Sequence, residues 1–363
     1  MSLYLCVDCG GSKTSAAICD ISGNIVGRGI GGPSNFAYLT PEEFISSVTV
    51  AVSNALKTCT SPLTEPVKLP PVDASPFDAA WFGVSGVDSP SAVAELTPHI
   101  STLLKIPPGP RLVVTNDIHL LASPLRIHPD VSYAVTVIAG TGSIAATLKE
   151  SDGKLQELGR TGGWGWMLGD EGGGFYLGRE AIRQILLEHD KASIGGPQPP
   201  HSYLATQILQ GFGITDIMEI LPIIHLPDPS TNKHLGPDSP PHLLMPKEKR
   251  LSSLSPLVFD AAFEHGDPLA LRILRTCASH LASYIALLLS DGSHEAPRAV
   301  KAQESLISFG GSLVGIEAYR KLILDDLEQR GHVFRYVEFV GDPAAAGAVG
   351  LATSARVSRD GPV

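Results

Sequence analysis

Residues 7–26 read VDCGGSKTSAAICDISGNIV, and residues 137–156 read VIAGTGSIAATLKESDGKLQ. The two stretches align without gaps at an offset of 130 positions. The paired residues include Gly10 with Gly140, Ala16 with Ala146, Ser22 with Asp152 and Gly23 with Gly153. Each stretch has an apolar strand, a turn rich in Gly, Ser or Thr, a second apolar strand, and a second turn into a third strand. Because one copy opens each half of the chain, the repeat predicts two related halves.

Helical and strand patterns alternate after each copy of the repeat. The predicted helices cover residues 41–57, 174–189 and 267–289, and the predicted buried parallel strands cover 79–84 and 111–115. This alternation is typical of an α/β fold. Two stretches rich in Pro, Ser and Gly, residues 60–78 and about 190–256, are predicted as loops or insertions, with a helix at 201–224 inside the second.

The composition favours a compact two-domain enzyme. The chain has 363 residues, of which 43% are hydrophobic and 18% charged, and its net charge is −10. Binding of nucleic acid or an anionic membrane would need a basic face, so neither is expected. No stretch approaches the roughly 18 to 20 apolar residues of a membrane span. A start without a basic region and five cysteines, an odd number, predict a cytoplasmic protein with reduced thiols. We expect Cys6 and Cys9 to be small buried residues.

The two glycine-rich turns are candidates for phosphate binding. Gly10 and Gly11 let the backbone approach an anion, while Ser12 and Lys13 can donate to it. Residues 139–143, AGTGS, offer the same features through Thr141 and Gly142. Either turn alone could be an ordinary hairpin turn. Finding both in the two copies of the repeat favours a cleft in which two turns face a nucleotide.

Two acidic residues end predicted strands of the first half. Asp8 precedes the first turn and could hold Mg²⁺ through water, or cap the turn. Asp117 follows residues 111–115, at the carboxyl end of a buried strand, where α/β proteins place ligands. It is a candidate catalytic base, and it could equally be the N-cap of the next helix. His119 is expected on the surface of that helix.

The segment TGGWGWMLGDEGGG, residues 161–174, is the most unusual in the chain. Packing does not justify so many glycines, because glycine costs backbone entropy and buries little surface. The segment is typical of a loop that brings backbone groups and a carboxylate to a polar ligand. Asp170 could accept hydrogen bonds from two hydroxyls of a sugar, with Trp164 supporting that wall.

The chain resembles the N-acetylglucosamine kinase and BadF/BcrA-type group of the sugar kinase, heat-shock chaperone and actin superfamily. The resemblance covers nearly the whole length. It is carried by D-C-G-G-S-K-T (8–14), G-V-S-G (83–86), T-N-D (115–117), A-G-T-G-S (139–143), G-G-W-G-W-M-L-G-D-E-G (162–172), F-G-G-S (309–312) and D-P-A-A-A-G-A-V-G-L-A (342–352).

The resemblance implies two actin-like, ribonuclease-H-like domains with a nucleotide and sugar cleft between them. The expected N-terminal domain is residues 1–117 plus the last helix, 343–357, and the second domain is 118–342 with the insertion at 190–256. Asp117 would take the proton of the sugar 6-hydroxyl, with ATP and Mg²⁺ as cofactors. The expected sugar-binding residues are Asn35, Asn116, Gly163, Trp164, Gly165 and Asp170. The expected ATP-binding residues are Gly10, Gly11, Ser12, Lys13, Thr141, Gly142, Gly310 and Gly311.

The expected reaction is phosphorylation of an amino sugar, with N-acetylglucosamine as the leading substrate. Glucosamine or another hexose stays open, because Ala37 stands where animal N-acetylglucosamine kinases have an aromatic residue. Two other classes are weighed. An ATPase activator of radical dehydratases needs cysteines for a shared iron–sulfur cluster, and no ligand pair is evident. A non-enzymatic sugar sensor would have lost its base, whereas Asp117 is present. A homodimer is a further possibility.

Overall fold

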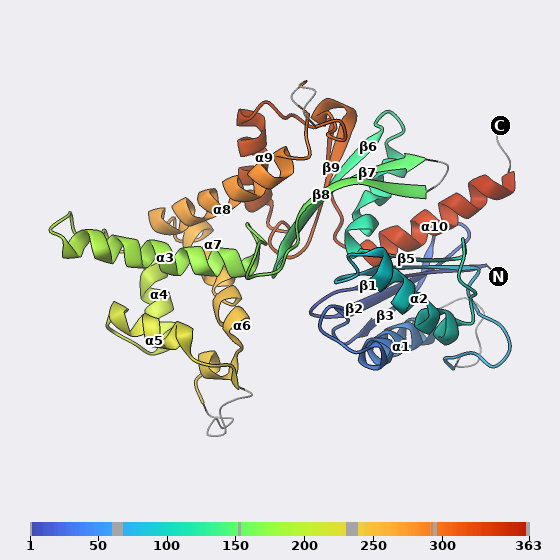
Figure 1. Ribbon diagram of the computed structural model, residues 1–363, viewed down its shortest axis with the longest axis horizontal. Helices are drawn as coiled ribbons and strands as arrows, with labels where there is room; N and C mark the ends of the chain where they lie inside the picture. Colours follow the sequence, from blue (N-terminus) through green and yellow to red (C-terminus); the bar gives the residue numbers. More distant parts are fainter. Residues whose placement is uncertain are drawn as a thin grey trace.

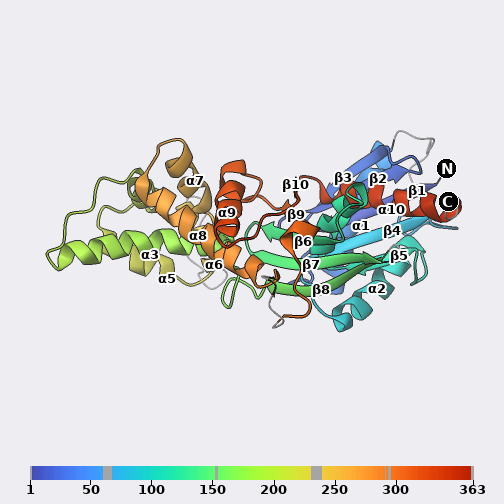
Figure 2. The same ribbon diagram turned by 90° about the horizontal axis from the view of Figure 1, so that it is seen from above.

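The computed structural model describes residues 2–59, 68–151, 154–229, 239–290, 292 and 296–360. It contains two five-stranded sheets with helices packed against them (Figure 1). Both chain ends lie beside the first sheet, while helices of the second half extend away from it in both views (Figures 1 and 2). This arrangement confirms the predicted α/β fold with two related halves.

The first sheet has the strand order β3-β2-β1-β4-β5. Its strands are β1 (Leu3–Cys9), β2 (Thr14–Asp20), β3 (Ile25–Gly31), β4 (Ala79–Val84) and β5 (Leu112–Thr115). Strand β4 runs parallel to β1 and β5, whereas β2 is antiparallel to both β1 and β3. Its helices are α1 (Pro41–Thr58) and α2 (Pro90–Leu104). Helix α1 starts at a capping box of Thr40 and Glu43 and buries Phe44, Val48 and Val52 at the predicted spacing.

The second sheet repeats this order as β8-β7-β6-β9-β10. Its strands are β6 (Tyr133–Ala139), β7 (Ser143–Ser151), β8 (Lys154–Gly162), β9 (Ser305–Gly310) and β10 (Tyr336–Phe339). The ungapped alignment is correct for β1 and β6 but wrong by one residue after the turn. Val7 pairs with Ala16, whereas Val137 pairs with Ala145, because residues 10–13 form the first turn and only 140–142 the second. The aligned pairs at residues 152 and 153 lie outside the described residues.

The helices of the second half cover its sheet and build the insertion. They are α3 (Gly174–Ser193), α4 (Tyr203–Phe212), η2 (Ile217–Glu219), α5 (Ile220–His225), η4 (Pro241–Leu244), α6 (Lys247–Ser252), α7 (Ser255–Phe263), α8 (Pro268–Ala286), η5 (Ala302–Glu304) and α9 (Glu317–Gln329). The predicted helix at 201–224 is interrupted, because Gly213 adopts the left-handed conformation and ends α4. The predicted loop at 190–256 is therefore partly helical.

No single helix among the described residues is long and apolar enough to cross a membrane. One bent pair, Tyr203–Phe212 with Ile217–His225, meets the requirements of length and composition when its two members are taken together.

Two helices lie between the sheets: η1 (Asp117–Ile127) and α10 (Pro343–Asp360). Leu120 packs with the first sheet and Ile118 with the second, so η1 belongs to both cores. Helix α10 packs three alanines, at 344, 348 and 352, against strands of the first sheet. Cys6 and Cys9 are fully buried, which confirms their predicted environment. The domain boundaries at 117/118 and 342/343 stay a prediction.

Candidate functional site

Asp117 is the first residue of η1, directly beyond the carboxyl end of β5. The helix cap is supplied by its neighbour, because the Asn116 side-chain oxygen accepts a hydrogen bond of 3.1 Å from the Ile118 N–H. Capping by Asp117, the alternative role left open by the sequence, is therefore wrong. Gly83 of β4 lets the helix start approach closely, since a Cβ there would lie 3.1 Å from the Asp117 Cα. The Asp117 carboxyl is therefore not the N-cap, although backbone hydrogen bonds from the Ile118 and Asp117 N–H groups act to lower its pKa.

The acidic residues around Asp117 repel one another. Burial, followed by the charges of Asp8 and Asp88, raises the pKa of Asp117 to about 7. Burial also raises the pKa of Asp8 to about 6, while Lys13 acts in the opposite direction and Asp342 in the same one. A site with two half-buried carboxyls and one nearby lysine is short of positive charge. This donor set suits Mg²⁺ held largely through water and phosphate oxygens.

The first glycine-rich turn is tied to the loop that carries Asn35. The Ser34 N–H donates to the Gly10 carbonyl at 2.9 Å, and the Thr14 hydroxyl bonds to the Ser34 hydroxyl at 2.6 Å. The Asn35 amide donates to the Ser85 hydroxyl at 3.2 Å, and its oxygen accepts from the Ala37 N–H at 2.9 Å. Turn residues Gly11, Ser12 and Lys13 are exposed. The structure therefore brings Asn35 beside the predicted phosphate turn.

Gly86 allows that loop to pack against the end of β4. Its φ is +84°, and an added Cβ would lie 2.5 Å from both the Ala37 nitrogen and the Asn35 side-chain oxygen. We expect Gly86→Ala to lower the free energy of unfolding by about 2–4 kcal/mol, because conformational strain and a backbone clash add. Urea denaturation measures this change. Gly195→Ala is the matched control, since its φ is also +84° but nothing lies within 4 Å. Equal losses for the two variants would contradict the clash.

The second turn opens into a cavity of about 420 Å³. Gly140 and Thr141 line it together with Ser312 and Leu313, which follow β9, and with Lys249 of α6. The Lys249 ammonium lies 3.5 Å from the Thr141 hydroxyl. A phosphate turn beside a cation and an apolar wall is suited to a nucleotide. No motif pointed to Lys249, because it comes from the insertion.

Three predicted ATP-binding residues lie next to this cavity instead of on its wall. An added Cβ on Gly310 would meet the Leu121 side chain at 2.7 Å, so that glycine packs on η1. Gly311 has φ +102°, and a Cβ there would lie 2.5 Å from the Ala139 carbonyl oxygen. Gly142 faces Asp170, whose carboxylate oxygen would lie 2.3 Å from its Cβ. These glycines therefore permit close packing behind the cavity.

Asp170 is held by the glycine-rich loop and is only 8% exposed. Burial raises its pKa to about 6, against hydrogen bonds from the Gly165 and Ser143 N–H groups that lower it. The pKa of Tyr38, a residue of the first half, is raised by desolvation and then by the charges of Glu248 and Asp170. The charge of the Asp170 carboxyl therefore acts on a residue of the first half.

The other predicted sugar-binding residues of this loop, Gly163, Trp164 and Gly165, are partly or fully exposed. Trp164 is 67% exposed, and the guanidinium of Arg160 lies 5.9 Å from the centre of its ring. Gly163 and Gly165 have φ values of +71° and +84°. Arg160 also bonds to Asp88, which lies after the G-V-S-G motif in the first half. Sequence reasoning passed over both charged residues, although each borders a motif that it had singled out. His119 bonds to Glu157 at 3.2 Å.

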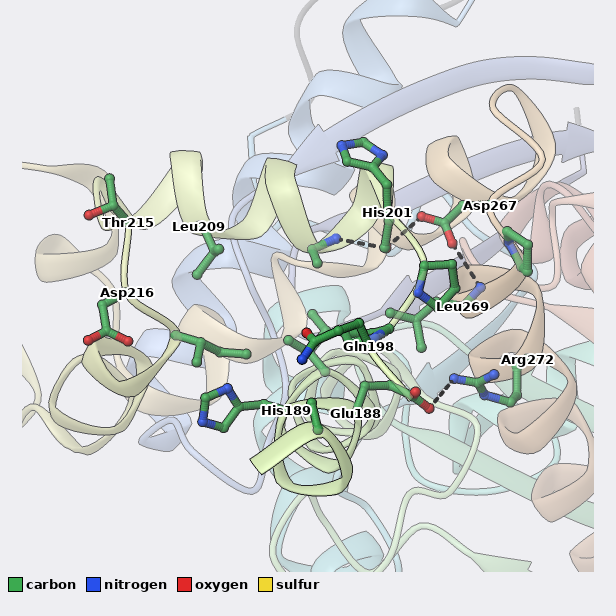
Figure 3. Close-up of a pocket in the computed structure, with 18 residues that line it drawn as sticks. Glu188, His189, Gln198, His201, Leu209, Thr215, Asp216, Asp267, Leu269 and Arg272 are labelled. Carbon is green, nitrogen blue, oxygen red and sulfur yellow. Dashed lines mark hydrogen bonds and ion pairs between the residues drawn. The ribbon is translucent and has the colours of Figure 1, made fainter. Parts of the chain in front are cut away.

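A larger cavity, of about 520 Å³, lies between the insertion and the helices on either side of it (Figure 3). It is bounded by α3, α4 and the start of α8. Glu188 and Arg272 form an ion pair of 2.8 Å at its edge, and Asp267 accepts a hydrogen bond of 2.7 Å from the Ser202 hydroxyl. None of the predicted site residues lines it. This cavity is therefore separate from the residues around Asp117.

Two sheets of the same strand order, each with a glycine-rich turn between its first two strands, define a two-domain α/β protein of the actin-like class. Residues 5–355 match the BadF/BadG/BcrA/BcrD ATPase family, so the chain belongs to this family.

Two kinases are similar to this chain in sequence. An N-acetylmuramic acid/N-acetylglucosamine kinase of Clostridium acetobutylicum is 28% identical over 195 residues, which are 53% of this chain and 56% of that protein. An N-acetyl-D-glucosamine kinase of Dictyostelium discoideum is 24% identical over 280 residues, which are 77% of this chain and 76% of that protein. The chain thus spans little more than half the length of the first relative.

Solved structures agree on the fold. A candidate N-acetylglucosamine kinase of Chromobacterium violaceum superposes with a TM-score of 0.60 at 22% identity, over 97% of this chain and 99% of that one. A ROK family glucokinase of Streptomyces griseus, solved with glucose and AMPPNP, gives a TM-score of 0.53 at 17% identity, over 99% and 100%. At these identities the likeness shows the fold alone.

Proposed function

We propose that this chain transfers the γ-phosphoryl group of ATP to an amino sugar, with N-acetylglucosamine and its O6 as the leading acceptor. The observation that carries the proposal is Asp117, a carboxyl at the end of β5 that follows the N-cap Asn116 and has its pKa raised to about 7. A general base is most effective when its pKa is close to the working pH. The two similar kinases act on sugars of this kind by name.

The proposed reaction needs one proton acceptor and one aligned phosphate. Asp117 takes the proton from the sugar 6-hydroxyl as that oxygen bonds to the γ-phosphorus, and the bond from phosphorus to the ADP oxygen breaks. The first turn and Thr141 would hold the phosphates, with Lys249 beside them. The 2-substituent would lie towards the loop of Asn35 and Ala37, and Asp170 would accept hydrogen bonds from hydroxyls of the ring. These residue roles are part of the proposal.

Asp8 is the residue that would hold Mg²⁺, through water. The bound ion would neutralise charge on the ATP phosphates. Burial raises the pKa of Asp8 even with Lys13 nearby, so a bound cation would favour its ionised form. Asp342, at the start of α10, adds to the negative charge near Asp8.

The other two classes have less support. Of the five cysteines, four are buried and only Cys59 is partly exposed, so they offer no surface pair for a cluster shared between subunits. A sugar sensor without chemistry would not need a carboxyl held at the end of β5 with a raised pKa. We place the protein in the cytoplasm and leave a homodimer as a prediction.

A panel of sugars tests the proposal. ADP release in the presence of ATP and Mg²⁺ is measured with glucose, glucosamine, N-acetylglucosamine and N-acetylmuramic acid. We expect an amino sugar to give the highest kcat/KM, with some turnover of its neighbours, because a small apolar contact discriminates by only about 1–3 kcal/mol. Preference for glucose would contradict the amino-sugar assignment and keep the kinase. If none of the four sugars leads to release of ADP, both the amino-sugar assignment and the kinase assignment are contradicted.

A further inference from the structure

One ion pair connects the two halves of the protein beside Asp117. Asp88 lies in the loop between β4 and α2 of the first half, and Arg160 lies on β8 of the second. The Arg160 Nη1 donates to the Asp88 Oδ1 at 2.9 Å. The same carboxylate oxygen accepts from the Asn116 Nδ2 at 2.9 Å. A single carboxylate therefore connects β8 to the residue that caps η1 and precedes Asp117.

Arg160 also contacts the glycine-rich loop of residues 162–172. Its guanidinium lies 5.9 Å from the Trp164 ring centre, and its Nη2 would lie 3.1 Å from a Cβ on Gly163. The Arg160 side chain is 23% exposed, and its Nε is buried without a hydrogen-bond partner in the described structure. Its position is thus set by Asp88 and by the loop.

We propose that Arg160 and Asp88 are positioning residues that align the glycine-rich loop of residues 162–172 with the start of η1. The inference rests on the proposed function, because it assigns the two sides of the sugar site to this loop and to Asp117. Arg160 contacts the loop at Trp164 and Gly163. Asp88 accepts a hydrogen bond from Asn116 and thereby positions the first turn of η1. Neither residue needs to touch the sugar. The glycine-rich loop and the start of η1 are then linked through one ion pair between residues 72 positions apart.

Kinetics of four variants test the pairing. Arg160→Met and Asp88→Asn are each expected to lower kcat/KM for the sugar by about 10²-fold, the size of effect that a displacement of about 1 Å produces. The KM for ATP is expected to stay unchanged, because the nucleotide cavity lies on other elements. The double variant should have a kcat/KM no lower than that of the less active single variant, since the first substitution already breaks the pair. Arg160→Lys should recover part of the loss.

The matched control is Arg126→Met. Arg126 of η1 forms a comparable ion pair of 3.1 Å with Glu150 of β7, away from the glycine-rich loop. We expect this variant to keep the sugar KM of the wild type. Additive losses in the double variant, an ATP KM that rises together with the sugar KM, or an equal effect of Arg126→Met would overturn the positioning role.

Hydrogen exchange gives a readout that does not depend on turnover. In the protein without substrates, amides of residues 162–172 are expected to exchange faster in Arg160→Met and Asp88→Asn than in the wild type or in Arg126→Met. Unchanged exchange in this loop overturns the inference. A wild type inactive on every sugar would instead contradict the proposed function, while faster exchange in the two variants would still support the alignment of the loop.

Discussion

Replacement of Asp117 by asparagine is expected to lower kcat by about 10²–10⁴-fold or more, while ATP and sugar still bind. Asparagine has nearly the same shape, and the cap of η1 comes from Asn116, so the helix start should be kept. The amide cannot accept the proton of the attacking hydroxyl. Single-turnover kinetics together with calorimetric titration of both ligands separate the chemical step from binding. A loss of less than about tenfold would show that Asp117 is not the base.

The pH dependence gives the same residue a second test. Because the base must be ionised, kcat/KM, which reports groups of the free enzyme, should rise with pH through about 7, the pKa of Asp117. The stability of the unliganded protein should change in the opposite direction. The folded-state pKa is raised above the ordinary value of 3.8, so folding favours the protonated form, and stability is lost as pH rises from about 4 to about 7.

Thermal unfolding at two pH values measures that loss. Asp117→Asn removes the ionisable group and should therefore melt at a higher temperature than the wild type at pH 8, but not at pH 4. A variant that loses turnover while gaining stability cannot be explained by damage to the fold. Equal melting temperatures of the variant and the wild type at pH 8 would mean that burial does not raise the pKa of Asp117.

Replacement of Arg250 by methionine is expected to destabilise the protein by on the order of 4 kcal/mol. Arg250 is 1% exposed and donates five hydrogen bonds to backbone carbonyls. These carbonyls belong to Ile223, Ile224, Leu226, His242 and Met245. Each buried carbonyl left without a donor costs about 1–3 kcal/mol, and the losses are not fully additive. Denaturant unfolding measures the change.

Two further variants identify its cause. Arg250→Lys keeps the positive charge but replaces the planar guanidinium by an ammonium group with fewer donors. An intermediate loss of stability is therefore expected. Arg183→Met is the control, because the Arg183 side chain is 60% exposed and forms an ion pair with Glu180 on the same helix. Such a surface pair contributes about 0–1 kcal/mol. A loss for Arg250→Met no larger than this would show that Arg250 does not organise the insertion. Arg250 would then not be the residue that positions its neighbour Lys249 beside Thr141.

Local patterns in the sequence were sufficient for most of the fold. The strand predicted at 79–84 has those bounds, and the helix predicted at 41–57 ends one residue later. Both depend on near neighbours: a run of apolar residues, or a cap and an apolar stripe. The predicted helix at 201–224 was wrong because a single left-handed glycine, Gly213, outweighs the apolar spacing around it. The repeat was recognised, although its second turn is one residue shorter.

The sequence by itself determined the fold class, the family resemblance and the candidate base, because these depend on motifs within a few residues of one another. Tertiary structure alone decided that Asn116 caps η1 and leaves Asp117 without that role. It also decided that Arg160 meets Asp88 and that Lys249 reaches the second turn. Hydrogen bonds, ion pairs and pKa values depend on distance and burial in space. Residues far apart in the chain meet only when both sheets and the helices between them are in place.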